Sequence, residues 1–240
     1  MVPAANAIAV GSGLDPALAA LTEPLGCIVH SCDMLRRASA RYAFGAADSF
    51  RIRSVLIVGG GIAGLLFVQY LRTVLGFDGT LLVSEPAAPK RKLAERFGAQ
   101  AIDPLSVDLA AAVPDATGGR RAELLIEASG VGAIFEAIPG LIRKQATVLL
   151  YGHGHDGVDL SVLNSVQFME PTLVPPAGAS GGFEPDGRPS TYLTALRLIE
   201  AGRIQVEPLV THRYDSLDAI PGAFAGGHRA PDYIKGVVTL

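Results

Sequence analysis

Short runs of apolar residues alternate along this chain with longer segments in which apolar residues recur every three or four positions. Short apolar runs next to glycine or charged residues are typical of strands buried on both faces of a sheet. The longer period is typical of helices that pack one face against a sheet. The alternation predicts an α/β fold with a doubly wound parallel sheet of six strands. The expected strands are Val55–Val58, Thr80–Ser84, Ala101-Ile102, Leu124–Ile126, Thr147–Tyr151 and Gln167–Val174.

Amphipathic segments lie between and around these strands. Glu23-Pro24 opens a helix whose apolar face is Leu25, Ile28, Val29 and Cys32, because proline is tolerated in a first turn. Further helices are expected at 62–75, 90–97, 130–138 and 191–201, and 209–240 holds only short elements. We therefore predict three parts: an inter-domain segment with a helix at 1–50, the sheet domain at 51–208, and a tail at 209–240.

A glycine-rich turn follows the first predicted strand. Gly59, Gly61 and Gly64 match the pattern G-x-G-x-x-G between a strand and a helix. The first glycine permits the tight turn, the second lets a pyrophosphate approach the backbone, and the third lets the helix pack on the strand. Glu85, at the end of the next strand, can accept hydrogen bonds from ribose hydroxyls and repel a 2′-phosphate. The pattern predicts a Rossmann dinucleotide site that prefers NAD to NADP.

Two other interpretations of this turn stay open. The glycines can serve packing alone, and methyltransferase-type sheets also pair a glycine loop with an acid after the second strand. Lys90 and Arg91 are nearby cations that weaken the preference for NAD.

Several segments in order carry a resemblance to a known family. The chain resembles the medium-chain, zinc-dependent alcohol and polyol dehydrogenases, nearest the sorbitol and threonine dehydrogenase-like branch. The segments are Glu23-Pro24-Leu25, Val58–Gly64, Leu93–Ala99, Ile126–Gly130, Val210–Tyr214 and Lys235–Val238.

The resemblance implies an NAD-dependent enzyme that moves hydride from a secondary alcohol, polyol or cyclitol to the cofactor. It also implies that the GroES-like domain, which carries most catalytic zinc ligands in this family, is absent from this chain. Glu23 matches a glutamate that ligates or approaches zinc in some members, so it is at most a partial ligand. The cofactor-binding positions implied are Gly59, Gly61, Ile62, Ala63, Gly64, Glu85, Lys90, Ala128, Ser129, Gly152 and His153. We expect bound NAD(H), no zinc held by this chain alone, and a homodimer through Gln167–Val174.

Another class of function remains open beside the enzyme. The chain can be a catalytically silent module that binds NAD(H) or self-associates, or half of a split enzyme whose barrel is encoded separately. On the same reasoning, Lys235–Thr239 is expected to be an exposed edge or to pair with a second copy.

The remaining histidines and cysteines carry weaker signals. Cys27 and Cys32 point apart on a helix, which disfavours a metal site with His30. His153, His155 and Asp156 share a loop after the fifth strand, where a polar loop and a cofactor-proximal role are both open. His212 is expected to be structural, and Arg120-Arg121 to be a solvated surface pair.

Composition excludes several classes of protein. The 240 residues are 49% hydrophobic and 18% charged, which excludes a disordered chain. The net charge is -3 and the 20 Lys and Arg are scattered, so nucleic acid is not an expected partner. Two cysteines make no disulfide framework. Charges interrupt the apolar stretch 124–142 and the N-terminus has no basic region, so we expect no membrane segment, no secretory signal and a cytoplasmic location.

Overall fold

The computed structural model describes residues 7–239 and divides them into two compact units. One unit is residues 33–176, and the other combines residues 7–32 with residues 177–239. The division predicted at residues 50 and 208 stays a prediction.

A six-stranded parallel sheet forms the middle of the unit 33–176. The strand order is β3-β2-β1-β4-β5-β6, so the chain starts in the middle and winds outward in both directions. This order confirms the predicted Rossmann sheet and places a topological switch point between β1 and β4. The strands are β1 (Ser54–Val58), β2 (Thr80–Ser84), β3 (Gln100–Ile102), β4 (Ala122–Glu127), β5 (Ile142–Leu150) and β6 (Thr172–Val174).

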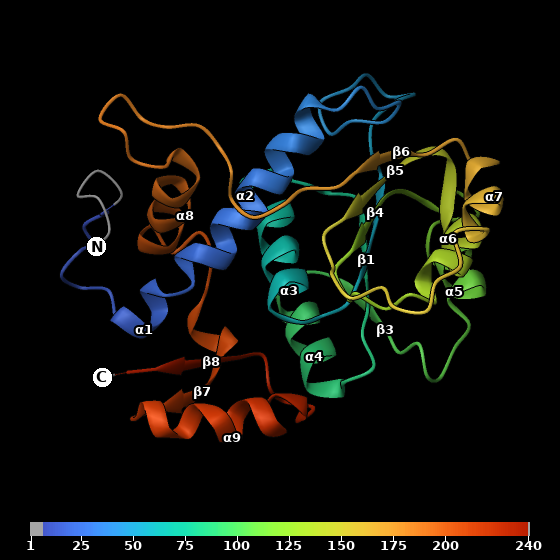
Figure 1. Ribbon diagram of the computed structural model, residues 1–240. Helices are drawn as coiled ribbons and strands as arrows, with labels where there is room; N and C mark the ends of the chain where they lie inside the picture. The colour runs from blue at the N-terminus through green and yellow to red at the C-terminus, as the bar shows by residue number, and fades with distance from the viewer. Residues whose placement is uncertain (1–6, 240) are drawn as a thin grey trace. The chain divides into compact units, whose positions relative to one another are not determined.

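Helices cover both faces of this sheet. Figure 1 shows α3 and α4 on one side and α5, α6 and α7 on the other. On the second side, apolar residues of β1, β2, β4 and β5 form one buried cluster with Val113, Ile138 and Val166 from the three helices. The helices are α3 (Ile62–Gln69), continued by the π-helical turn η2 (Tyr70–Val74), α4 (Ala88–Arg96), α5 (Leu109–Ala116), α6 (Ile134–Leu141) and α7 (Val162–Gln167).

The last strand is shorter than predicted. Only Thr172–Val174 pairs with β5, and α7 ends at Gln167, where the strand was expected to begin. Helix α7 was not predicted, although Val162 and Val166 have a helical spacing and Val166 is buried against the sheet. β6 is the edge strand of the sheet, and a homodimer through it stays a prediction.

The second unit contains helices and a small parallel sheet. β7 pairs with β8, and His212 stacks on Tyr233 with ring centroids 4.5 Å apart, which agrees with a structural role for this histidine. The predicted edge 235–239 therefore pairs within its own chain. The elements are α1 (Pro16–Ala19), α2 (Thr22–Arg37, which continues into the other unit), α8 (Ser190–Glu200), η3 (Glu207–Leu209), β7 (Val210–Tyr214), η4 (Leu217–Ala219), α9 (Ile220–Ala225), η5 (Gly227–Arg229) and β8 (Lys235–Val238).

Across residues 7–239, no helix is both long and apolar enough to span a bilayer.

Candidate functional site

The glycine turn between β1 and α3 has the geometry that its sequence predicts. Gly59 has φ +100°, a left-handed conformation that favours glycine, and its N–H donates to the Ser84 carbonyl at 2.9 Å. A Cβ on Gly64 would lie 1.9 Å from the Gly59 carbonyl oxygen. A Cβ on Gly61 would have no atom within 4 Å, so the backbone there faces open space. Gly59 and Gly64 thus serve the fold, and Gly61 keeps the approach to the turn clear.

The start of α3 presents backbone donors beside this open position. Leu65 N–H makes the first helical bond, to the Gly61 carbonyl at 3.0 Å. The N–H groups of Ile62, Ala63 and Gly64 precede that bond and have no acceptor within the helix. Together with the positive end of the helix dipole, they suit a phosphate.

Glu85 lies directly under the turn, at the carboxyl end of β2. Its side chain is buried, and Oε2 accepts from Gly60 N–H at 2.7 Å while Oε1 accepts from Ala87 N–H at 2.9 Å. Each carboxylate oxygen has a second lone pair left for a ligand hydroxyl. The glutamate is therefore fixed in place by backbone donors before any ligand arrives.

The two cations after β2 differ in their surroundings. Arg91 donates to the carbonyls of Glu85 and Pro86 and pairs with Asp103 at 2.9 Å. Lys90 instead lines the cleft beside Glu85. Lys90 is thus the cation that a bound ligand meets first.

A cleft of about 650 Å³ lies at the carboxyl ends of the strands. It brings together six of the predicted cofactor positions, namely Gly59, Gly61, Glu85, Lys90, Ala128 and Ser129. Apolar residues after β3 and from α6 complete its walls, including Leu109 and Ile134. The other five predicted positions are not among the residues that line it, namely Ile62, Ala63, Gly64, Gly152 and His153, and His153 is exposed.

A buried glutamate under the cleft is the residue that sequence reasoning did not single out. Glu127 ends β4, and Ser129 N–H and Gly130 N–H both donate to its carboxylate. Its other oxygen pairs with His155 Nε2 at 2.8 Å. The signal was a glutamate directly after the apolar run Leu124–Ile126, because a buried carboxylate there needs several donors.

The residues considered for zinc do not fit a zinc site in this chain. Glu23 Oε1 accepts from Cys27 Sγ at 3.5 Å, and His30 Nε2 lies 3.4 Å from Ser180 Oγ. Within residues 7–239, no group of three or more His, Cys, Asp or Glu side chains could hold a metal ion. A catalytic zinc needs three protein ligands, so no step of a reaction is assigned to zinc here.

Tyr192 packs beside Glu23 and Cys27 in this part of the molecule. Burial raises the pKa of Tyr192, and the nearby Glu23 and Cys27 raise it further. A Cβ on Gly26 would lie 2.6 Å from the Tyr192 ring, so this glycine lets helix and tyrosine pack closely. The cluster is therefore explained by packing.

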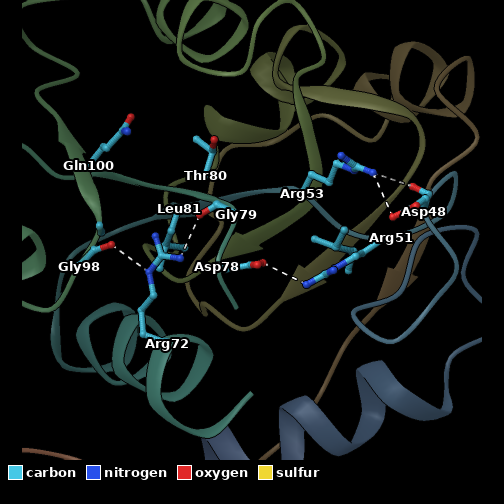
Figure 2. Close-up of a pocket in the computed structure, with 12 residues that line it drawn as sticks. Asp48, Arg51, Arg53, Arg72, Asp78, Gly79, Thr80, Leu81, Gly98 and Gln100 are labelled. Carbon is cyan, nitrogen blue, oxygen red and sulfur yellow. Dashed lines mark hydrogen bonds and ion pairs between the residues drawn. The ribbon is translucent and has the colours of Figure 1, made fainter. Parts of the chain in front are cut away.

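A second cavity, of about 730 Å³, lies at the opposite end of the sheet. Figure 2 shows that its arginines point to partners: Arg51 to Asp78, Arg53 to Asp48, and Arg72 to backbone carbonyls. Ligands of doubly wound sheets bind at the carboxyl ends of the strands. We therefore assign the candidate site to the cleft beside Glu85.

Arg72 in this cavity should stabilise the fold. Its guanidinium donates to the carbonyls of Gly98, Phe77 and Gly79 at 2.6 to 2.9 Å and so joins η2 to the segments that lead into β2 and β3. We expect Arg72→Met to lower the free energy of unfolding by about 2 kcal/mol, because three carbonyls lose a charged donor. Urea denaturation measures this. Arg51→Met is the matched control, since the Arg51–Asp78 pair is exposed, and equal losses in both variants would contradict the assignment.

Comparison with known proteins assigns most of the chain to one family. Residues 63–201 match the family described as "Zinc-binding dehydrogenase". The L-threonine 3-dehydrogenase of Pyrococcus furiosus is 28% identical over 225 residues, which are 93% of this chain and 58% of that protein. The L-galactonate-5-dehydrogenase of Escherichia coli is 27% identical over 241 residues, covering all of this chain and 63% of that protein. The chain thus spans about three fifths of these relatives.

Solved structures agree with these relatives. A putative zinc-binding dehydrogenase from Sinorhizobium meliloti, bound to NADP, has 25% identity and a TM-score of 0.72, covering 96% of this chain and 61% of its own. An alcohol dehydrogenase from Escherichia coli in complex with NADH has a TM-score of 0.77 at 19% identity, covering 100% of this chain and 64% of its own, and this likeness shows the fold alone. The family match extends over more than half of the chain and includes Glu85, Lys90 and Ser129, which line the cleft. This chain belongs to the zinc-binding dehydrogenase family.

Proposed function

We propose that this chain is the cofactor-binding portion of an alcohol or polyol dehydrogenase and that it binds NAD(H) in the cleft beside Glu85. The observation that carries the proposal is the open backbone at Gly61 between the free donors of α3 and the fixed Glu85 carboxylate. A packing turn alone has no need of this open position. The relatives named above are dehydrogenases of threonine and of a sugar acid, which favours a secondary alcohol or polyol as the substrate class.

Each part of the cleft has a task in holding the cofactor. The N–H groups of Ile62 and Ala63 would donate to the pyrophosphate, and Glu85 would accept from the adenosine ribose hydroxyls. Ala128 and Ser129 form the wall after β4. When bound, the nicotinamide supplies the chemistry by accepting a hydride from the alcohol.

The charge around Glu85 favours NAD over NADP. A buried carboxylate at the ribose would repel a 2′-phosphate. Arg91, which could offset that repulsion, is held by Asp103 and two carbonyls. Lys90 remains to contact the ribose or the pyrophosphate.

Replacing Glu85 should test the proposal directly. We expect Glu85→Ala to raise the Kd for NADH at least tenfold, about 1.4 kcal/mol, because the ribose loses a charged acceptor. Glu85→Gln keeps an acceptor for Gly60 but loses the negative charge. The Kd values for NADH and NADPH should therefore differ less than in the unmodified chain. Calorimetric titration of the purified chain with both cofactors measures these changes.

Glu95→Ala is the matched control, because Glu95 is an exposed residue of α4. It should leave both affinities unchanged. Absence of NADH and NADPH binding by the unmodified chain would contradict the proposal and favour the alternative in which the glycines serve packing alone.

A further inference from the structure

Glu127 sits where the loops after β4 and β5 meet. Its side chain is 0% exposed, and its carboxylate Oε1 accepts from Ser129 N–H at 2.7 Å, Ser129 Oγ at 2.5 Å and Gly130 N–H at 3.0 Å. Its backbone carbonyl accepts from Tyr151 N–H and Gly152 N–H at 2.9 and 2.8 Å. One residue therefore sets the path of both loops.

The second carboxylate oxygen of Glu127 has its partner in the loop after β5. His155 Nε2 lies 2.8 Å from Oε2, and its half-buried ring packs edge-on against Phe135 of α6 with centroids 4.9 Å apart. A buried carboxylate oxygen that loses its donor keeps the full cost of desolvation. His155 thus completes the set of donors that keeps the charged group in place.

The two loops approach each other too closely to tolerate a shift of this carboxylate. A Cβ on Gly152 would lie 2.3 Å from Glu127 Oε2, and a Cβ on Gly130 would lie 2.0 Å from the His153 carbonyl oxygen. A carboxylate without its histidine would rotate toward water, and Ser129 and Gly130 would lose their acceptor. Ser129 lines the cofactor cleft.

We propose that His155 is a positioning residue of the cofactor cleft. Through Glu127 it fixes the Ser129 wall in the form that receives the cofactor, and it makes no contact with the cofactor itself. The inference rests on the proposed function for its effect on NADH, but its effect on the loop stands without any ligand.

Three variants test this role. We expect His155→Ala to raise the Kd for NADH about tenfold and to speed amide exchange at Ser129 and Gly130 at least tenfold in the cofactor-free chain. His155→Gln places an amide donor near the position of Nε2 and should restore most of both properties. His228→Ala, which removes an exposed histidine of the other unit, should change neither.

The two readouts separate the possible failures. Unchanged exchange at Ser129 and Gly130 in His155→Ala would overturn the positioning role, whatever the cofactor does. Equal losses in the Ala and Gln variants would also overturn the positioning role. They would mean that His155 acts through its shape, because the amide donor of glutamine then restores nothing. The unmodified chain could fail to bind NADH while amide exchange at Ser129 and Gly130 is still faster in His155→Ala and mostly restored in His155→Gln. In that case the proposed function fails and the positioning of the loop is supported.

Discussion

Gly64→Ala should lower the free energy of unfolding far more than Gly61→Ala. Gly61→Ala should instead lower the affinity for the cofactor more than it lowers the free energy of unfolding. At Gly64 the added methyl would meet the Gly59 carbonyl oxygen at 1.9 Å, so β1 or α3 must move. Overpacking of this kind costs roughly 1–3 kcal/mol or more. We expect Gly64→Ala to lose about 3 kcal/mol of unfolding free energy.

At Gly61 the same methyl meets empty space. The backbone there has φ -70° and ψ -167°, an extended conformation that alanine adopts, so the loss of stability should be about 1 kcal/mol, the cost of alanine at a helix N-cap. The methyl would stand where the pyrophosphate approaches, and the Kd for NADH should rise at least tenfold. Urea denaturation and NADH titration of both variants check this. Unchanged NADH affinity in Gly61→Ala would mean that the cofactor does not cross this turn.

The glycine turn was predictable from sequence because every determinant lies within one strand, one turn and one helix. The preference of Gly59 for a left-handed conformation and the proximity of Gly64 to the turn follow from local geometry. Glu85 was predictable for the same reason, since it ends the adjacent strand. Strand order then follows from alternating elements and right-handed crossovers.

Elements without a clear hydrophobic period were not predictable in this way. Helix α5 was missed because Leu109–Ala116 has no polar face to mark a helical period and contains Pro114, although its four alanines favour a helix. The Glu127–His155 pair joins residues 28 positions apart. Their meeting depends on the register of β4 and β5 and on the path of a loop, neither of which the sequence shows.

Glu123 is a second case of a buried carboxylate completed by distant residues. Its Oε1 accepts from Arg120 at 2.9 Å and from Arg143 at 2.6 Å, and its Oε2 accepts from Arg53 N–H at 2.5 Å. It lies where the register between β4 and β5 shifts. Arg120 is exposed, as its position beside Arg121 suggests, and its guanidinium also pairs with the buried carboxylate of Glu123.

These donors stabilise the charged form of Glu123. Burial acts to raise the pKa of Glu123, but the hydrogen bonds from Arg120, Arg53 N–H and Arg143 outweigh it and hold the pKa below the ordinary 4.5. A group whose pKa is lower in the folded state stabilises that state fully above its unfolded pKa. The stabilisation is lost as the pH falls through the folded value.

We expect Glu123→Gln to lower the free energy of unfolding by about 3 kcal/mol at pH 7, or roughly 6 to 12 °C in Tm, because two arginines lose their common anion. The difference from the unmodified chain should hold from pH 7 to about pH 5. It should shrink as the pH falls below 4.5, because the unfolded chain then binds a proton at Glu123 while the native carboxylate stays charged until the pH reaches its lower pKa. Calorimetric scans at pH 7, 5 and 3 measure both effects. Glu170→Gln breaks an exposed pair with Lys144 and should leave Tm unchanged. A Glu123→Gln difference that persists undiminished at pH 3 would show that the side chain acts through its shape rather than its charge.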